Sequence, residues 1–245
     1  LGDVYKRQAI LFDFGDTLIN TDKFDYDLCL KKVHESLAND NISVPYEEFK
    51  NAYFDVRNRL YKETEDSLRE PDFRLRIAET LKRFGYTFKP EDAIIVRSAD
   101  AFGDAVVPMM QMEPYVPKLL QKLKTEHKYK IGLVSNFAHP TTPWKKTLEK
   151  FHITKYFDAL IVSGEVGWRK PSPKIFKKAL QALNVKASET VFVGDSPKHD
   201  IEGAKKIGMK TILIKKASTN ENEETGDPDK RISELKELPK VLSEL

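Results

Sequence analysis

Residues 159–195 read ALIVSGEVGWRKPSPKIFKKALQALNVKASETVFVGD, and this stretch decides the fold class of the 245-residue chain. It begins and ends with short apolar runs rich in β-branched side chains, which are typical of strands buried on both faces of a parallel sheet. Between the runs, apolar residues recur at helical spacing after Ser172, a suitable N-cap, and Pro173, a suitable first helical residue. The stretch therefore predicts a strand, a crossover helix and a second strand.

Three further apolar runs have the same design, and they are AILFDF (9–14), IGLVSN (131–136) and TILIKK (211–216). A second helical stripe around Ile201–Ile207 ends at Gly208, before the last of these runs. Strands that alternate with helices in this way predict an α/β fold, a doubly wound, Rossmann-like parallel sheet. We assign residues 9–20 and 106–245 to this core domain.

The first two predicted strands are separated by a segment much longer than one crossover helix requires. Within residues 21–105, apolar side chains recur at helical spacing in three stripes, at Tyr26–Leu37, Phe49–Leu60 and Phe73–Phe84. We interpret 21–105 as a smaller, all-helical domain inserted into the core domain. It carries a net charge of −4 and the remainder carries +7, so the basic excess belongs to the core domain.

Two polar segments lie outside the predicted elements. Residues 1–8, LGDVYKRQ, lack periodicity, and we expect a non-native or disordered tail. Residues 215–230 are rich in turn formers and predict a mobile loop, followed by a short closing helix at about 230–245. Cys29 is the sole cysteine, which excludes an intramolecular disulfide and favours a small buried hydrophobe.

Composition and charge exclude several classes of protein. The chain is 40% hydrophobic and 32% charged, which is typical of folded globular proteins and not of collagenous or disordered ones. Its net charge of +3 is too small for a general attraction to nucleic acid or to an anionic membrane. No apolar run approaches the roughly 20 residues of a membrane helix, and no signal peptide is evident. We therefore expect a cytoplasmic protein with neither nucleic acid nor membrane as a partner.

Polar side chains follow the predicted strands at their carboxyl ends, where open parallel sheets bind ligands. Asp13, Asp195 and Asp200 would crowd together there, and they could not all stay ionised without a compensating cation. Hard oxygen ligands in a partly open site favour Mg²⁺. Taken singly, each polar residue has a structural explanation as a cap, a turn or a surface charge. The ordered set favours a site, and its members are Asp13, Ser135, Asn136, Lys170, Asp195 and Asp200.

The residues of this set lie in four short motifs, which are FDFGDTL (12–18), LVSN (133–136), GWRKPSPKIF (167–176) and GDSPKHD (194–200). In this order, the motifs resemble those of the haloacid dehalogenase superfamily, whose aspartate-nucleophile hydrolases are mostly phosphatases. The resemblance covers residues 9 to about 216. The helical insertion is similar to the family's cap domain, which closes over the site and selects substrates.

The resemblance implies how the matched residues would handle a phosphoryl group. Asp13 matches the nucleophile, which would form an aspartyl phosphate that water later hydrolyses. Ser135 matches the hydroxyl that holds the phosphoryl group, and Lys170 matches the lysine that offsets its negative charge. Thr17 matches the threonine of the first motif and Asn136 ends the second, and we expect both to help bind the substrate.

The resemblance also implies a metal site. Asp13, Asp195 and the backbone carbonyl of Gly15 match ligands of Mg²⁺, and Asp200 matches a supporting carboxylate. The ion would offset the charge that develops as one anion attacks another.

One departure from the family pattern concerns the general acid. Family phosphatases carry a second Asp two residues after the nucleophile, where it protonates the leaving oxygen, and Gly15 occupies that position here. Loss of such a group typically costs a factor of about 10² to 10⁴ in rate. Asp16 is one residue further along, so the loop would have to shift for it to act as the acid.

Three functions stay open on this basis. The first is a Mg²⁺-dependent phosphatase of a small phosphorylated metabolite, best on leaving groups that need little protonation, such as aryl or acyl phosphates. The second is a carbon–halogen or carbon–phosphorus hydrolase, since family dehalogenases and phosphonatases also lack that Asp. The third is a weakly active binding or regulatory protein. Neither GxxxxGK[ST] nor GxGxxG follows the first strand, which disfavours nucleotide-binding folds.

Substrate choice is expected to depend on the cap and on the rim of the site. His139 follows Asn136 closely enough to approach the site, and Trp168 is a candidate for its entrance. The chain is either a monomer or a homodimer, since the apolar stripes of the cap suit both. The cap candidates for substrate contact are Tyr26, Tyr53, Arg57, Tyr61 and Arg74.

Overall fold

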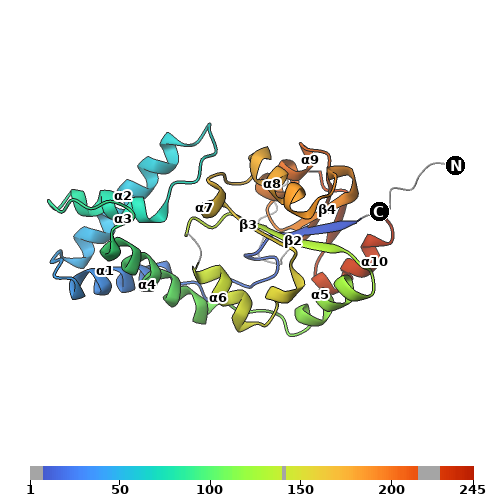
Figure 1. Ribbon diagram of the computed structural model, residues 1–245, viewed down its shortest axis with the longest axis horizontal. Coiled ribbons are helices and arrows are strands. Elements are labelled where there is room, and N and C mark those ends of the chain that lie inside the picture. The colour runs from blue at the N-terminus through green and yellow to red at the C-terminus, as the bar shows by residue number, and fades with distance from the viewer. Residues whose placement is uncertain (1–7, 140–141, 215–226) are drawn as a thin grey trace.

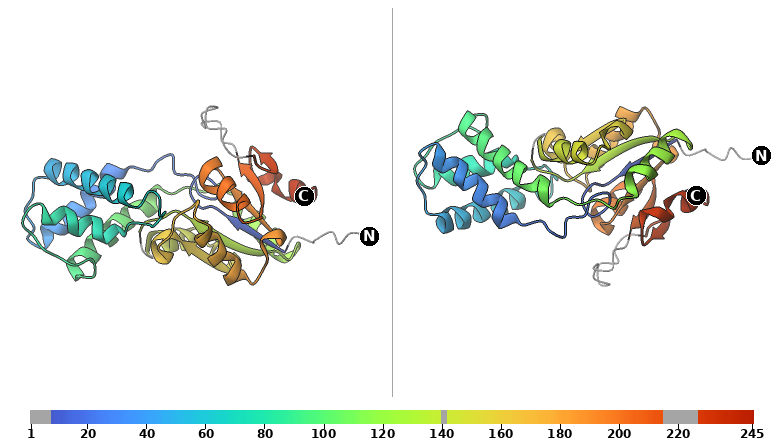
Figure 2. Two further views of the ribbon diagram at one scale, coloured as in Figure 1. Left: turned by 90° about the horizontal axis from the view of Figure 1, so that it is seen from above. Right: turned by 90° about the horizontal axis from the view of Figure 1, so that it is seen from below.

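The computed structural model describes residues 8–139, 142–214 and 227–245. Figure 1 shows two domains side by side, an α/β core domain and a cap of four helices. Seen from above and from below (Figure 2), the cap lies beyond one end of the sheet, and the C-terminus lies at the opposite end. The two-domain arrangement places the cap next to the carboxyl ends of the strands, where the predicted site residues lie.

The core domain contains a sheet of six parallel strands in the order β3-β2-β1-β4-β5-β6. The strand order reverses direction between β1 and β4, which is the topological switch point of a doubly wound sheet. The predicted fold class is therefore confirmed. The strands are β1 (Ala9–Phe12), β2 (Lys130–Ser135), β3 (Ala159–Val162), β4 (Thr190–Gly194), β5 (Lys210–Ile214) and β6 (Lys230–Ile232).

Helices cover both faces of the sheet, which explains why the strands read as continuous apolar runs. Alternate residues of β1 serve the two faces: Ile10 and Phe12 belong to one hydrophobic cluster, and Ala9 and Leu11 belong to the other. The first cluster includes residues of α5 (Val116–Thr125), α6 (Thr142–Lys150) and α10 (Leu238–Leu242). The second includes residues of α8 (Pro173–Leu183) and α9 (Gly203–Lys205).

The predicted crossover helix after β3 is α8, and its start is as expected. Ser172 is the N-cap of α8, and its hydroxyl accepts a hydrogen bond from the Lys174 amide. Pro173 is the first residue of the helix. A short helix, α7 (Ser163–Val166), lies between β3 and α8. The stripe around 201–207 differs from the expected regular helix. It forms a π-helical turn at Pro197–Glu202 that continues into the short α9.

The cap consists of α1 (Tyr26–Asn39), α2 (Tyr46–Glu63), α3 (Phe73–Lys82) and α4 (Ala93–Met109). The first three correspond to the predicted stripes. α4 packs against α1 and α3 of the cap and also against α6 of the core domain. Its buried side chains Ile95, Ala99, Phe102 and Val106 recur at helical spacing, so α4 carries one buried stripe that continues past residue 105.

The chain passes between the domains at Asn20 and Gln111. These residues pair in antiparallel fashion, with the Asn20 amide 2.7 Å from the Gln111 carbonyl and the reverse bond at 3.2 Å. The boundary that we placed between residues 105 and 106 falls inside α4, which continues to Met109. A boundary at 20 and 111 fits the helix and the paired linkers better.

Both ends of the core domain differ from expectation. Gln8, which we assigned to the tail, bridges two strands, because its amide donates to the Glu189 carbonyl and its own carbonyl accepts from Lys130. Residues 1–7 and most of the expected 215–230 loop lie outside the described residues. The closing segment begins with the edge strand β6, not with a helix, and α10 starts only at Leu238 after a 3₁₀ turn at Leu235–Glu237. A three-residue edge strand with only Ile232 buried leaves no apolar run to find in the sequence.

Cys29 is buried and belongs to the hydrophobic core, as expected of a small apolar side chain. Within the described residues, no helix is long and apolar enough to cross a membrane.

Candidate active site

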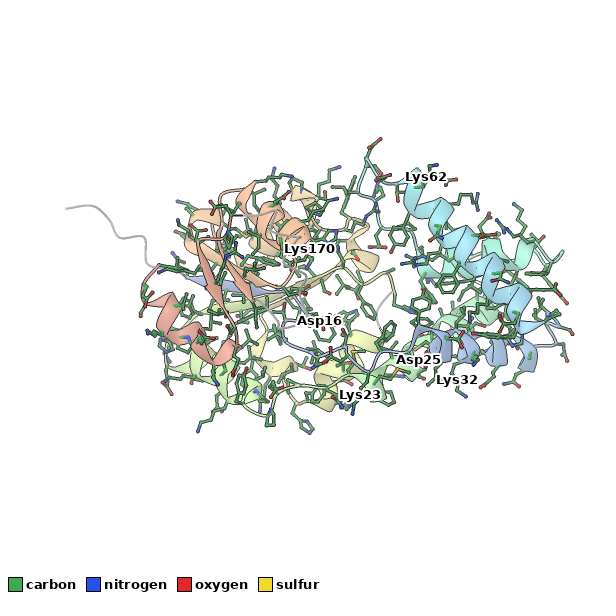
Figure 3. All side chains as sticks on the ribbon, turned by 180° about the vertical axis from the view of Figure 1, so that it is seen from behind. Asp16, Lys23, Asp25, Lys32, Lys62 and Lys170 are labelled. Carbon is green, nitrogen blue, oxygen red and sulfur yellow. The ribbon has the colours of Figure 1, made fainter. Side chains whose placement is uncertain are left out.

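A cavity of about 390 Å³ lies at the carboxyl ends of the central strands, between the core domain and the cap. Figure 3 shows Asp16 and Lys170 on the side of the core domain that faces the cap. The predicted residues that line the cavity are Asp13, Gly15, Ser135, Asn136, Lys170, Asp195 and Asp200. The structure thus brings together residues that are up to 187 positions apart in the sequence.

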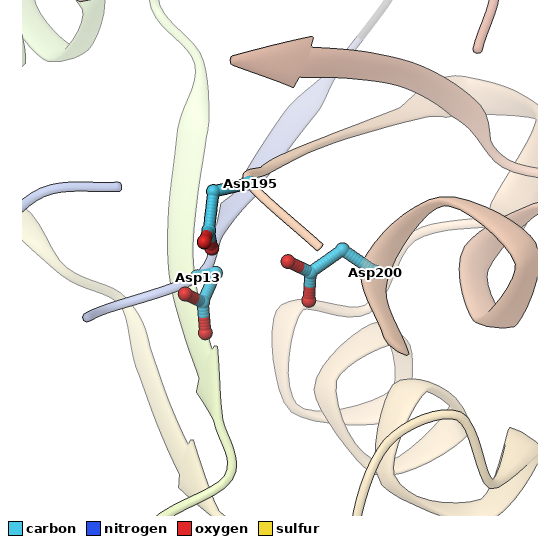
Figure 4. A group of neighbouring side chains, drawn as sticks. All are labelled: Asp13, Asp195 and Asp200. Atoms are coloured by element: carbon cyan, nitrogen blue, oxygen red, sulfur yellow. The ribbon is translucent and has the colours of Figure 1, made fainter. Parts of the chain in front are cut away.

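Three carboxylates and one ammonium form the centre of the cavity floor. Asp13 follows β1, Asp195 follows β4, and Asp200 lies in the π-helical turn, so the first two flank the switch point of the sheet. Ligand oxygens of all three lie within 4.8 Å of one another (Figure 4). Lys170 Nζ lies 2.5 Å from Asp13 Oδ1 and 2.6 Å from Asp200 Oδ1.

The charge balance of this cluster is unfavourable for ionised carboxylates. Burial raises the pKa of Asp13 to about 8, with the neighbouring Asp200 and Asp195 charges adding to the rise against the opposing effect of Lys170. Burial and Asp200 likewise raise the pKa of Asp195 to about 6. Burial alone would lower the pKa of Lys170, but Asp13 and Asp200 outweigh it and raise that pKa above its usual value. One ammonium is therefore too little positive charge for three carboxylates, and a divalent cation would complete the balance.

Asn136 fixes the loop that carries Lys170. Its side-chain oxygen accepts from the Lys170 amide at 2.6 Å, and its Nδ2 donates to the Lys170 carbonyl at 3.1 Å. Both polar ends of the side chain are thereby used on this backbone. Asn136 positions Lys170 in this way and also lines the cavity, so the substrate contact that we expected of it stays a prediction.

Thr17 is placed differently from expectation. It is buried but does not line the cavity, and its hydroxyl donates to Asp195 Oδ1 at 3.4 Å. The turn from Phe14 to Ile19 directs its side chain behind the carboxylate, where Phe14 accepts hydrogen bonds from Leu18 and Ile19. Thr17 thus supports a carboxylate of the centre.

Asp200 is held in place by its own turn. The Ser196 amide donates to Asp200 Oδ2 at 3.0 Å. Gly194 leaves room for this carboxylate, because a Cβ at that position would lie 2.4 Å from Asp200 Oδ2. A side chain at residue 194 would displace one of the three carboxylates.

Gly15 and Asp16 decide what lies at the position of the family's general acid. Asp16 has φ of 57° and lines the cavity, but its carboxylate accepts hydrogen bonds from the Thr21 hydroxyl, with both oxygens at 2.8 Å. The Asp16 carboxylate is therefore held against Thr21. Among the residues that the structure describes, only Thr21 Cγ2, at 3.6 Å, would meet a Cβ at Gly15, so a side chain can begin there without a clash.

His139 reaches the cavity, as expected from its distance along the chain. It is buried, and its ring lies 4.6 Å from that of Phe102, centroid to centroid, in a stacked arrangement. Burial, assisted by the charge of Arg76, holds the pKa of His139 well below its usual value. His139 thus contributes a neutral aromatic wall.

Trp168 is part of a contact between the two domains and not of the cavity lining. Its ring lies 4.0 Å from the Arg69 guanidinium and 3.3 Å from Lys174 Nζ. Next to it, the Arg169 guanidinium donates to the Thr64 hydroxyl at 3.1 Å and to the Thr64 carbonyl at 3.0 Å. This junction ties the loop after α2 to the loop that carries Lys170.

Among the cap candidates, Tyr26, Arg57 and Tyr61 line the cavity. Tyr53 is fully buried behind Tyr26, with their hydroxyls 2.8 Å apart, and Arg74 pairs with Asp72 at 2.9 Å outside the cavity. Sequence reasoning missed several lining residues, most of them apolar or aromatic, and for the cap the only signal was an arginine in the middle of the apolar α3 stripe. Four of them matter for the shape and charge of the cavity. They are Phe73, Arg76, Phe102 and Phe137.

The fold and the site define a hydrolase with an α/β core, a helical cap and an aspartate–lysine centre. The family model of haloacid dehalogenase-like hydrolases matches residues 8–208. The chain belongs to this family, which confirms the resemblance inferred from the four motifs.

Known proteins of this type are similar over nearly the whole chain. A glyceraldehyde 3-phosphate phosphatase of Pyrococcus furiosus is 31% identical over 96% of this chain and 92% of its own length. A crystal structure of a 2-haloacid dehalogenase from Pseudomonas syringae pv. Tomato matches with a TM-score of 0.72 and 25% identity, covering 97% of this chain and 98% of that one. A haloacid dehalogenase-type phosphatase from Thermococcus onnurineus matches with a TM-score of 0.61 and 27% identity, covering 96% and 97%.

Proposed function

We propose that the protein is a Mg²⁺-dependent phosphatase of a small phosphorylated metabolite that works through an aspartyl phosphate at Asp13. The observation that carries the proposal is the buried Asp13 carboxylate at the switch point, 2.5 Å from Lys170 Nζ and beside two further carboxylates. The phosphatase relative that spans 96% of this chain supports the same reaction class.

The donor set fits a hard divalent cation. Asp13, Asp195 and the backbone carbonyl of Gly15 would hold Mg²⁺, and Asp200 would support them from its position beside Lys170. The raised pKa values of Asp13 and Asp195 are those of a carboxylate cluster whose charge balance requires a cation. When bound, the ion supplies positive charge that keeps Asp13 ionised and offsets the charge of the phosphoryl oxygens.

The chain's own residues then account for the remaining roles. An Asp13 oxygen attacks phosphorus in line with the leaving oxygen, so the new P–O bond forms as the ester P–O bond breaks. The Lys170 ammonium and the Ser135 hydroxyl, both at the cavity floor, stabilise the phosphoryl oxygens. Attack of water on the aspartyl phosphate releases phosphate and returns the Asp13 carboxylate. Asn136 and Thr17 keep Lys170 and Asp195 in position.

The leaving oxygen departs without the family's acid. Gly15 has no proton to give, and the Asp16 carboxylate accepts from the Thr21 hydroxyl. Substrates whose leaving oxygen needs little protonation, such as aryl and acyl phosphates, are therefore favoured. Equal kcat values for an aryl and an alkyl phosphate would contradict this leaving-group argument.

Phosphate release from phenyl phosphate tests the proposed reaction. We expect turnover with Mg²⁺, loss of turnover after chelation with EDTA, and loss of at least about 10³-fold in Asp13→Asn, since no nucleophile is left. Asp66→Asn, at an exposed carboxylate of the cap, is the matched control. Turnover that survives in Asp13→Asn, or that is absent from a broad phosphate panel, would refute the proposal.

A second candidate, a carbon–halogen hydrolase, is favoured by Gly15 and by the similarity to the haloacid dehalogenase structure. Halide is a good leaving group, so displacement at carbon needs no acid. The acidic cluster argues against it, because attack on an uncharged carbon centre does not require a divalent cation. Halide release from 2-chloropropionate in EDTA would establish this second activity.

A further inference from the structure

The cap side of the cavity carries positive charge that phosphoryl transfer does not use. Arg57 of α2 and Arg76 of α3 line the cavity together with Tyr61. The Tyr61 ring lies 5.2 Å from the Arg57 guanidinium and 4.8 Å from that of Arg76. The guanidinium of Arg169, from the core domain, lies 5.2 Å from the same ring. Cations over the face of a tyrosine ring are attracted by its negative centre, so the ring holds this group together.

Arg76 is the structural member of the group. It is 3% exposed and pairs with the equally buried side chain of Glu70 at 3.2 Å, and it donates to the Tyr61 hydroxyl and to the Pro71 carbonyl, both at 2.9 Å. Its Nε has no hydrogen-bond partner within the described part of the chain. Glu70 balances the charge of Arg76 and accepts from the Tyr61 hydroxyl at 2.8 Å, so this pair positions Tyr61.

Arg57 differs from Arg76 because its charge is not balanced by a carboxylate. In residues 8–139, 142–214 and 227–245, no carboxylate lies within 4.0 Å of its guanidinium, whose hydrogen bond goes to the Asn58 side chain at 3.3 Å. The cap as a whole has an acidic excess, with carboxylates available for pairing on the same helix. Arg59, two residues away, pairs with Glu79 at 3.1 Å. Only Arg57 of these two lines the cavity.

The walls between the two ends of the cavity are mostly aromatic and aliphatic, with Phe73, Phe102 and Val106 among them. Apolar walls screen charge poorly, so an unbalanced guanidinium there attracts an anion more strongly than it would in water. The cavity thus has one end that suits a transferred phosphoryl group and a second, cationic end that suits another anionic group.

We infer that Arg57, supported by Tyr61 and Arg76, binds a second anionic group of the substrate, a carboxylate or a second phosphate, at the end remote from the transferred phosphoryl group. The planar guanidinium can donate two parallel hydrogen bonds to either group. This inference rests on the proposed phosphatase function and specifies the substrate class. Neutral phosphomonoesters leave the Arg57 charge unpaired and are poorer substrates.

Matched aryl phosphates test the inference. The probes are 4-carboxyphenyl phosphate, its neutral isostere 4-carbamoylphenyl phosphate, and 1,4-phenylene bisphosphate, which distinguishes a second phosphate from a carboxylate. We expect kcat/KM for at least one of the two doubly anionic probes to exceed that for the carbamoyl probe by about 10- to 100-fold, the range of a charge-assisted hydrogen bond.

Variants of α2 assign the preference to one residue. Arg57→Gln is expected to reduce the ratio of kcat/KM values to within about threefold of unity, and Arg57→Lys, which keeps the charge without the planar fork, to an intermediate value. Arg59→Gln is the matched control, because its side chain pairs outside the cavity, and it should keep the full preference. A preference that survives in Arg57→Gln would overturn the assignment. So would a ratio near unity for both doubly anionic probes in the parent protein.

Binding measurements separate this inference from the proposed function. Isothermal titration of the three probes into Asp13→Asn, with Mg²⁺ present and no turnover, reports the same preference as a ratio of Kd values. In one outcome, the parent turns over none of the probes, but Asp13→Asn binds the doubly anionic probes at least tenfold more tightly than the carbamoyl probe, and adding Arg57→Gln abolishes this difference. The phosphatase function is then refuted and the anion site stands. Equal Kd values for all three probes overturn the anion site alone.

Discussion

Restoring the missing acid by Gly15→Asp is expected to raise activity on alkyl phosphates. The described residues leave space for the Cβ of this side chain, since at Gly15 it would make only an ordinary contact, 3.6 Å, with Thr21 Cγ2. Gly15 is also not among the residues with positive φ, so an aspartate there is not strained. The new carboxyl would extend from the loop between Asp13 and Asp16, both of which line the cavity.

The size of the effect follows from the role of the proton. A well-placed general acid contributes about 10² to 10⁴ in rate. We expect the lower end, about 10²-fold or roughly 2.7 kcal/mol of activation free energy, because no neighbour in this site has been shaped to orient the new carboxyl. An aryl phosphate, whose leaving oxygen needs little protonation, should gain less than about threefold.

The assay is kcat for glycerol 3-phosphate against kcat for phenyl phosphate, in the parent protein and in Gly15→Asp. Gly15→Asn is the matched control, because it has the same shape and cannot act as an acid at this position. The reasoning is refuted if Gly15→Asn raises alkyl turnover as much as Gly15→Asp. It is equally refuted if Gly15→Asp folds, turns over the aryl phosphate and leaves alkyl turnover unchanged.

Three further predictions concern the centre and the domain junction. Because the pKa of Asp13 is raised, the folded protein keeps a proton on this carboxyl between about pH 4 and pH 8, where the unfolded chain has lost it. In EDTA, the free energy of unfolding should therefore fall as pH rises through this window. Asp13→Asn should be more stable than the parent at pH 8 by roughly 1–3 kcal/mol, measured by urea titration. A parent protein with a flat profile would contradict the charge balance derived above. Mg²⁺ at about 100 times its Kd should stabilise the parent by about 2.7 kcal/mol, measured as a rise in Tm. Asp195→Asn should lose most of this gain. An equal rise in Tm in the variant would exclude Asp195 as a ligand. Arg169→Ala removes the hydrogen bonds to Thr64 at the domain junction. It should raise KM by roughly 3- to 30-fold, which corresponds to the loss of about one to two hydrogen bonds. A KM unchanged within error would show that this junction does not affect substrate binding.

Local patterns in the sequence were sufficient to locate the strands β1 to β5 of the core domain. The strands are buried on both faces, so they appear as apolar runs, and α8 has a cap and a proline at its start that mark its boundary. β6 could not be found in the same way, because a three-residue edge strand with one buried side chain leaves no run. The predicted domain boundary between residues 105 and 106 falls inside α4, because the buried stripe of this helix continues to Val106 and the helix ends only at Met109.

The residues of the centre could be named from the sequence, but the internal hydrogen bonds of Thr17 and Asn136 could not. Thr17 and Asn136 occur in motifs together with residues of the centre, which made substrate contact the natural expectation. Whether a hydroxyl or an amide reaches the substrate depends on the direction of its side chain in a turn. In the fold, Thr17 is directed to Asp195 and Asn136 to the backbone of Lys170.

The sequence by itself determined the class of fold, the order of the motifs and the set of acidic and basic residues at the strand ends. Parallel strands buried on both faces appear in the sequence as short apolar runs, and the carboxyl ends of such strands meet at one edge of the sheet. Only the tertiary structure decided that Arg57 and Arg76 share a cavity with Asp13, and that Arg74 does not. The physical reason is that the cap helices are oriented by packing between residues far apart in the chain. The side of each helix that meets the core domain is therefore a property of the packed molecule.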